Sequence, residues 1–177
     1  KPDEDVSIVD MPSGNMGQAV ETKTVDAAFI WEPFTSQALA RGNANIILDM
    51  NKAAPEYPWY IVVALADTID KRRADMLKVL AAHKKAVEFL NSSPTAGNDI
   101  IINTFKLKDV THTSGKVIKA EEIVAMARQR LGWAWDINDK DKQFVQRLMD
   151  YSYKLGYIKN PMKVADVVDE SLISELK

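Results

Sequence analysis

The chain has 177 residues, of which 46% are hydrophobic and 27% are charged, and its formal net charge at pH 7 is -2. This composition is typical of a folded globular chain of about one domain, and the scattered lysines and arginines argue against a nucleic-acid or anionic-membrane surface. The absence of cysteine excludes disulfides, thiolate chemistry and zinc-ribbon sites.

The first 50 residues alternate between apolar runs and helical patterns. After the first run, Pro12 and Gly14 interrupt the chain and Ser13 can cap a helix. In that helix Met16, Ala19 and Val20 recur at helical spacing, as on one face of an amphipathic helix. The predicted strands are residues 6–11, 25–31 and 45–50, and the predicted helices are residues 15–23 and 34–41, the second ending at Gly42. This order predicts an α/β fold with parallel strands.

The character of the chain changes after residue 50. Pro55 and Pro58 favour extended or turn geometry, and residues 59–66 (WYIVVALA) predict a fourth apolar strand, which we interpret as a crossing between two lobes. Beyond it the pattern is helical, with helices predicted at residues 70–90, 120–131 and 140–155. The inner face of the second is predicted to be Ala120, Ile123, Val124, Ala127 and Leu131, and the third is expected to begin at a capping Asp139 and to end at Gly156.

Polar residues follow the first two predicted strands. Ser13 and Asn15 come after one, and Trp31 and Glu32 come after the other. Because ligands of parallel sheets bind at the carboxyl ends of strands, near free N–H groups of helix N-termini, we expect these four residues to bind a small polar or anionic ligand. Two structural alternatives stay open: Trp31 can cover the core, and Glu32 can simply interact with the dipole of the next helix.

The stretch VDAAFIWEPF (residues 25–34), preceded by a strand and a short helix, resembles the substrate-binding proteins of ABC transporters for nitrate, taurine, aliphatic sulfonates and bicarbonate, a group that includes thiamine-precursor binders. Residues 82–94 (AHKKAVEFLNSSP) and 155–161 (LGYIKNP) are similar to a long helix and the closing helix of that family. The chain departs from the family pattern at Lys23-Thr24, where a glycine is common. The resemblance implies a periplasmic-binding-protein-like (type II) fold of two lobes, of which this chain looks like the C-terminal part.

The resemblance also implies an organisation and a set of partners. Residues 1–50 would form the end of the second lobe and the crossing, residues 51–66 the hinge strand, and residues 67–177 the helical C-terminal part of the first lobe. The expected partners are a small-molecule ligand, the ABC permease and ATPase subunits, and a missing N-terminal portion of the same protein, without which the fragment is expected to self-associate. The implied location is the periplasm or, as a lipoprotein, the cell surface.

An enzyme and a sensor are the alternatives. Asp10 and Glu32 could divide acid and base roles at the sheet edge, but the sequence contains no nucleophile motif, and His83 and His112 are not at metal-ligand spacing. We therefore assign no catalytic residue, metal ligand or cofactor and expect a binding protein. A ligand-sensing domain of a regulator would have the same pattern. Tyr57 and Trp59 flank the presumed hinge, either as aromatic cover or as ligand contacts.

Overall fold

The computed structural model describes residues 4–55 and 57–177. The chain divides into two compact units, each made of two separate stretches of sequence. Unit 1 contains the chain up to Ile47 together with Pro94–Gly132, and unit 2 contains Leu48–Ser93 and Trp133–Lys177.

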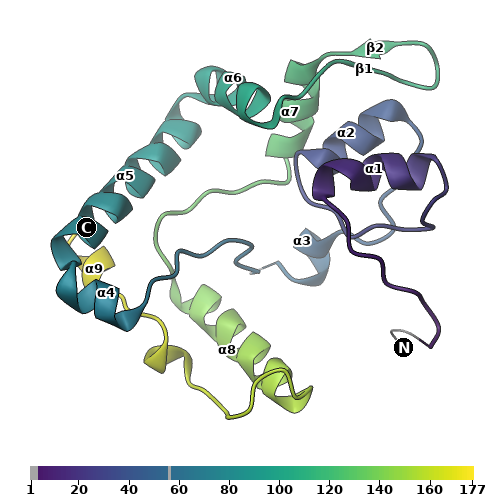
Figure 1. Ribbon diagram of the computed structural model, residues 1–177. Helices are drawn as coiled ribbons and strands as arrows, with labels where there is room; N and C mark the ends of the chain where they lie inside the picture. The colour runs from purple at the N-terminus through teal and green to yellow at the C-terminus, as the bar shows by residue number, and fades with distance from the viewer. Residues whose placement is uncertain (1–3, 56) are drawn as a thin grey trace. The chain divides into compact units, whose positions relative to one another are not determined.

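Unit 1 is a group of helices with one short hairpin. Helix α2 contacts α1, α7 and β1, and α6 contacts α7, an arrangement that can be followed in Figure 1. Strands β1 and β2 pair antiparallel, with Val110 opposite Ile118. The elements are α1 (Ser13–Glu21), α2 (Phe34–Arg41), α6 (Pro94–Phe105), β1 (Val110–Thr111), β2 (Val117–Ile118) and α7 (Ala120–Arg128).

The core of unit 1 lies on one face of α7. Ile123 and Val124 have no exposed surface, and Ile123 packs with Ala40 of α2 and Val110 of β1. Val124 forms a second cluster, whose other buried members are Leu107 and Ala120. The inner face predicted for this helix is therefore confirmed from Ala120 to Ala127, because side chains three and four residues apart share one side of a helix.

Glycine permits two close approaches in unit 1. A Cβ on Gly17 of α1 would lie 3.3 Å from the Cβ of Ala38 of α2, so the two helices pack more closely there than most side chains allow. Gly42 ends α2 with a φ of 78°, as the sequence predicts. A Cβ at Gly42 would also lie 2.5 Å from the His112 ring, so the hairpin turn occupies the space that a side chain would need.

Unit 2 is helical in its described part. Helix α9 contacts α5, where Arg73 of α5 pairs with Glu175 and the Lys84 ammonium donates to the carbonyl of Leu176. The predicted helix over residues 70–90 is divided at Arg72 into two helices. The elements are α3 (Met50–Ala53), α4 (Ala66–Lys71), α5 (Arg73–Ser92), α8 (Asp139–Lys154), the 3-10 helix η1 (Val164–Asp166) and α9 (Ser171–Ser174).

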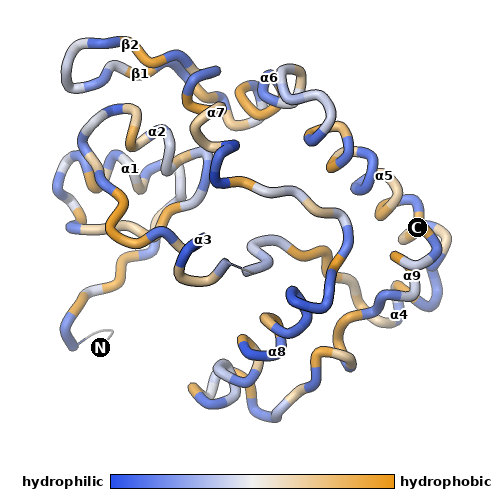
Figure 2. Tube along the Cα trace, turned by 180° about the vertical axis from the view of Figure 1, so that it is seen from behind, coloured by the Kyte–Doolittle hydropathy of each residue, from blue (hydrophilic) through white to orange (hydrophobic). Residues whose placement is uncertain are grey.

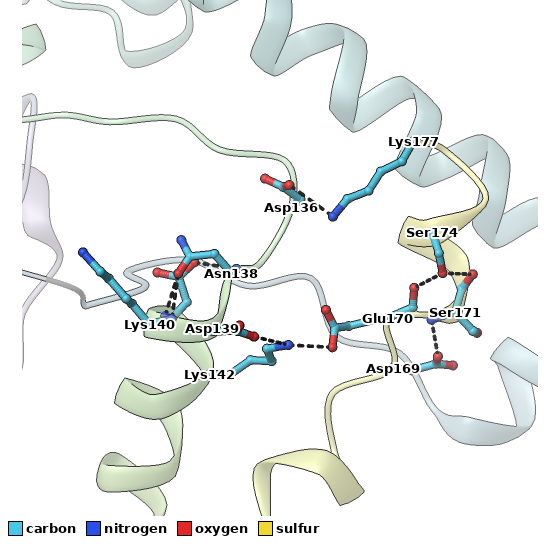
Figure 3. A network of polar contacts seen from close by, with 11 residues as sticks. Asp136, Asn138, Asp139, Lys140, Lys142, Asp169, Glu170, Ser171, Ser174 and Lys177 are labelled. Atoms are coloured by element: carbon cyan, nitrogen blue, oxygen red, sulfur yellow. Dashed lines mark hydrogen bonds and ion pairs between the residues drawn. The ribbon is translucent and has the colours of Figure 1, made fainter.

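A polar network joins the start of α8 to the C-terminal segment (Figure 3). The cap of α8 is Asn138, whose side-chain oxygen accepts from the N–H groups of Lys140 and Asp141 at 2.8 and 3.1 Å, so the prediction of Asp139 as the cap is wrong. Asn138 has the extended backbone that aims a side chain at these N–H groups. Asp139 is instead the first helical residue, and it pairs with Lys142, which also reaches Glu170 at 2.8 Å.

Apart from a single bridge residue, Val6, the four predicted strands show no pairing in the described chain. The sheet found there consists of β1 and β2 alone, whereas residues 6–11, 25–31, 45–48 and 59–65 are extended or irregular. Figure 2 shows hydrophobic stretches along these segments, and many of their side chains are exposed, including Ile8, Ile47, Tyr60, Val63 and Leu65. The parallel sheet is thus a wrong prediction for this chain by itself. Composition can favour a strand, but a strand also needs a neighbour for its N–H and C=O groups.

One of these segments, residues 59–65 (WYIVVAL) of unit 2, is called the extended apolar segment below. It contains no charged residue, and Tyr60 and Val63 are both 80% exposed. Successive side chains of a strand point to opposite faces, and both faces of this segment are apolar. Such a segment is suited to a sheet that is covered on both faces.

Candidate functional site

The turn before α2 presents an exposed indole on a firmly held backbone. Trp31 is 38% exposed. Its carbonyl accepts from the N–H of Thr35 at 3.2 Å, and the Thr35 hydroxyl donates to the carbonyl of Ile30, also at 3.2 Å. The first turn of α2 therefore holds the carbonyl groups that precede and follow the Cα of Trp31. The indole itself stays partly exposed, so a ligand can contact it.

Glu32, the next residue, is buried in a polar network. Its side chain is 6% exposed. One carboxylate oxygen accepts from the N–H of Ser36 at 3.0 Å, and the other accepts from Nη1 of Arg130 at 3.2 Å. The same Arg130 nitrogen lies 3.3 Å from the hydroxyl of Ser36, a residue with no exposed surface. The structural alternative for Glu32, a contact with the N-terminus of the following helix, is thus present in the structure.

Sequence reasoning missed Arg130. It lies just after α7, 98 residues from its partner Glu32 in the chain, and its side chain is 29% exposed. A basic residue near a helix end is ordinary in sequence terms, since it interacts favourably with the helix dipole. No local pattern could have connected it with Glu32, because their contact depends on the packing of α7 against α2.

Ser13 and Asn15, the other two predicted ligand residues, lie in the first turn of α1. Pro12 takes the cap position, and no side chain caps the helix, so the predicted capping by Ser13 is not formed. The N–H of Asn15 donates to the carbonyl of Pro12 at 2.9 Å. Ser13 is half-buried and Asn15 is exposed.

The four predicted residues are thus located in unit 1, two in the first turn of α1 and two in the turn before α2, and their role as ligand contacts stays a prediction. Between α1 and α2 is a cavity of about 40 Å³, which has room for roughly three waters. Organic ligands occupy pockets of about 300 Å³ or more. The cavity is therefore too small for such a ligand. It is lined by Gly14, Gly17, Gln18, Phe34, Gln37, Ala38 and Arg41.

The residues considered for catalysis or metal binding lie on different elements of the chain. Asp10 is exposed on the first extended segment, and His83 is exposed on α5. His112 shares a hydrogen bond of 2.8 Å with Ser114 in the hairpin turn. In residues 4–55 and 57–177, no three His, Cys, Asp or Glu side chains come together in a way that could hold a metal ion.

The two aromatic residues of the presumed hinge pack against each other and against α8. The ring centroids of Tyr57 and Trp59 are 4.6 Å apart, and Tyr57 meets Phe144 edge-on at 5.2 Å. These contacts all lie within unit 2. They support the interpretation of Tyr57 and Trp59 as aromatic cover.

Comparisons with known proteins identify the family. No helix in the described part of the chain is long and apolar enough to cross a membrane. No curated protein and no solved structure matches the chain. The family model that matches is that of the NMT1-like family, over residues 1–104, and this region includes the VDAAFIWEPF stretch. The match covers more than half of the sequence and agrees with the broad resemblance to periplasmic-binding-protein-like solute receptors. The chain belongs to the NMT1-like family, which implies a solute-binding role for an ABC transporter.

Proposed function

We propose that this protein is the solute-binding subunit of an ABC importer, exported to the periplasm or held at the cell surface as a lipoprotein. Its ligand is a small organic or oxyanionic solute of the nitrate, sulfonate, taurine, bicarbonate or thiamine-precursor type, which it binds without chemical conversion. Membership of the NMT1-like family is the observation that carries this proposal.

The proposed residues of the solute-binding site are Ser13, Asn15, Trp31 and Glu32. The first turn of α1 has no side-chain cap, and the dipole of a helix N-terminus favours an anionic group there. The exposed indole of Trp31 suits the body of the solute. Because the cavity between α1 and α2 is small, a complete site needs further walls.

In this proposal the protein has two lobes, and the lobes together supply the remaining walls of the site. Residues 51–66 form the hinge between residues 1–50 and residues 67–177. An N-terminal portion of the same protein supplies the neighbouring strands, and the exposed extended segments support this part. The solute contacts both lobes only in the closed form, so its binding favours closure. The permease and ATPase subunits recognise that closed form.

A thermal-shift screen tests the proposal on the full gene product. The solutes are nitrate, bicarbonate, taurine, alkyl sulfonates and pyrimidine precursors, with chloride at equal ionic strength as the control. We expect one class to stabilise the protein by about 2.7 kcal/mol at 100 times its dissociation constant. A screen without any stabiliser contradicts the proposal, and so does NMR showing that a stabilising solute is chemically converted.

A further inference from the structure

We infer that Arg130 is a positioning residue for solute recognition: it fastens Glu32 against α2 and thereby holds the Trp31 turn in one conformation. Glu32 acts through this contact and does not itself touch the solute. The inference deepens the proposed function and rests on it for the role of Trp31.

The carboxylate of Glu32 is already used inside the protein. One oxygen accepts from the Ser36 N–H and the other from Arg130, and the side chain is 6% exposed. A buried carboxylate is tolerated only with such donors, because it has given up its water. To contact a solute, Glu32 would have to leave both donors, and Arg130 and Ser36 would lose an acceptor.

Hydrogen bonds hold the main chain on either side of Trp31, whose indole remains exposed. Thr35 holds the carbonyls of Ile30 and Trp31, and Ser36 holds the carboxylate of Glu32. These contacts come from the first turn of α2 and fix the main chain before and after the Trp31 side chain. An indole kept in one place loses less conformational entropy when a ligand stacks on it.

Arg130 is far in sequence from the residues it contacts in this network. The hydrogen bonds that the Thr35 hydroxyl and the Ser36 N–H donate are local, within five residues of their partners, and would move together with α2. Arg130 connects the turn to the end of α7, the helix whose Ile123 and Val124 are completely buried. Its own N–H donates to the carbonyl of Ala127 at 2.9 Å, so the anchor belongs to the best-packed part of unit 1.

Fluorine NMR tests the positioning directly, without any solute. The protein is labelled with 5-fluorotryptophan after its other three tryptophans are changed to phenylalanine, so that Trp31 gives the signal; these are Trp59, Trp133 and Trp135. We expect one sharp Trp31 resonance in the protein that keeps Arg130 and a broadened or divided resonance in Arg130→Met. In Arg130→Lys the single sharp resonance should return. The control is Arg72→Met, which removes an exposed pair with Asp75 in unit 2 and should leave the Trp31 signal unchanged.

Solute titration completes the test, using whichever screened solute stabilises the wild-type protein. If Arg130→Met reduces the binding-competent turn to about a tenth of the population, the apparent dissociation constant rises about tenfold. Glu32→Gln replaces one of the two acceptor oxygens by an NH2 group, so either the Ser36 N–H or Arg130 loses its acceptor. This variant should therefore weaken binding and broaden the Trp31 resonance together, as Arg130→Met does.

Two results overturn the inference. One is a single sharp Trp31 resonance in a folded Arg130→Met protein, with the neutral Arg130→Gln variant used instead if the methionine variant does not fold. The other is loss of binding in Glu32→Gln with an unchanged Trp31 resonance, which would mean that Glu32 touches the solute. If the proposed function itself is wrong, the outcome is different. No solute would bind to the wild-type protein, while the Trp31 fluorine spectrum would still show whether Arg130 holds the turn.

Discussion

Trp31→Ala distinguishes an indole that contacts a solute from one that covers the core. At 38% exposure, roughly three-fifths of the side chain is buried, which for a tryptophan is about 150 Å². At about 25 cal/mol per Å² this area corresponds to about 4 kcal/mol as an upper limit, since the unfolded chain also buries some of it. Alanine retains part of the contact, so we expect the free energy of unfolding to fall by about 2 kcal/mol, below the range of about 3–5 kcal/mol for a completely buried aromatic.

Urea melts and solute titrations of the same preparations measure the two effects. We expect Trp31→Ala to weaken binding by about thirtyfold, as for a strong contact of about 2 kcal/mol. Trp59→Ala is the matched control, because Trp59 is 39% exposed but packs against the tilted ring of Tyr57 in unit 2. It should cost similar stability and leave the affinity unchanged. Unchanged affinity in Trp31→Ala together with a much lower urea midpoint would refute the assignment of Trp31 to the site.

Three further predictions concern surfaces and turns. The 177-residue chain should self-associate as its concentration rises in light scattering, and Val62→Lys in the extended apolar segment should reduce this; a wild-type chain that stays monomeric contradicts the expectation. The hydrogen bonds of Asp109 to the Lys119 ammonium and to a main-chain N–H lower the pKa of its carboxyl, so its stabilising effect is complete above the pKa of the unfolded chain and is lost as pH falls through the folded-state pKa. In a carboxyl NMR titration, Lys119→Met should raise this pKa, and an unmoved titration would remove the lysine as its cause. In thermal melts Gly115→Ala should cost about 1 kcal/mol for its positive φ alone, and Gly42→Ala should cost more, because a Cβ there meets the hairpin as well; equal costs would argue against that contact.

Nearby residues were sufficient to predict the ends of a helix and its apolar face. Helix α2 begins at Phe34 and ends before Gly42 as predicted, because proline precedes its first turn and glycine readily takes the positive φ after its last. The apolar spacing of α7 predicted its buried face from Ala120 to Ala127. On α8 the same kind of spacing was less informative. Leu148, Tyr151 and Leu155 recur at helical spacing and would be expected to face a core, yet all three are exposed, since amphipathic spacing identifies a face but not what covers it.

Helix α6 and the β1–β2 hairpin were not predicted, and the reason is tertiary. Residues 94–105 (PTAGNDIIINTF) include glycine, asparagine and three isoleucines, all weaker helix formers than alanine or leucine. The packing of Ile101 and Ile102 against the cluster of Leu107, Ala120 and Val124 stabilises the helix in spite of this composition.

The sequence by itself determined the family-specific stretch at residues 25–34, helices α1, α2 and α7 of unit 1 and the apolar character of the extended segments, because each depends on neighbouring residues. Only the tertiary structure decided that these segments lack paired strands in the described chain, and that the carboxylate of Glu32 is held by Arg130. Both are contacts between residues far apart in sequence. A β-ladder needs a second segment at hydrogen-bonding distance, and a buried ion pair needs two helices to bring its charges together; local composition specifies neither.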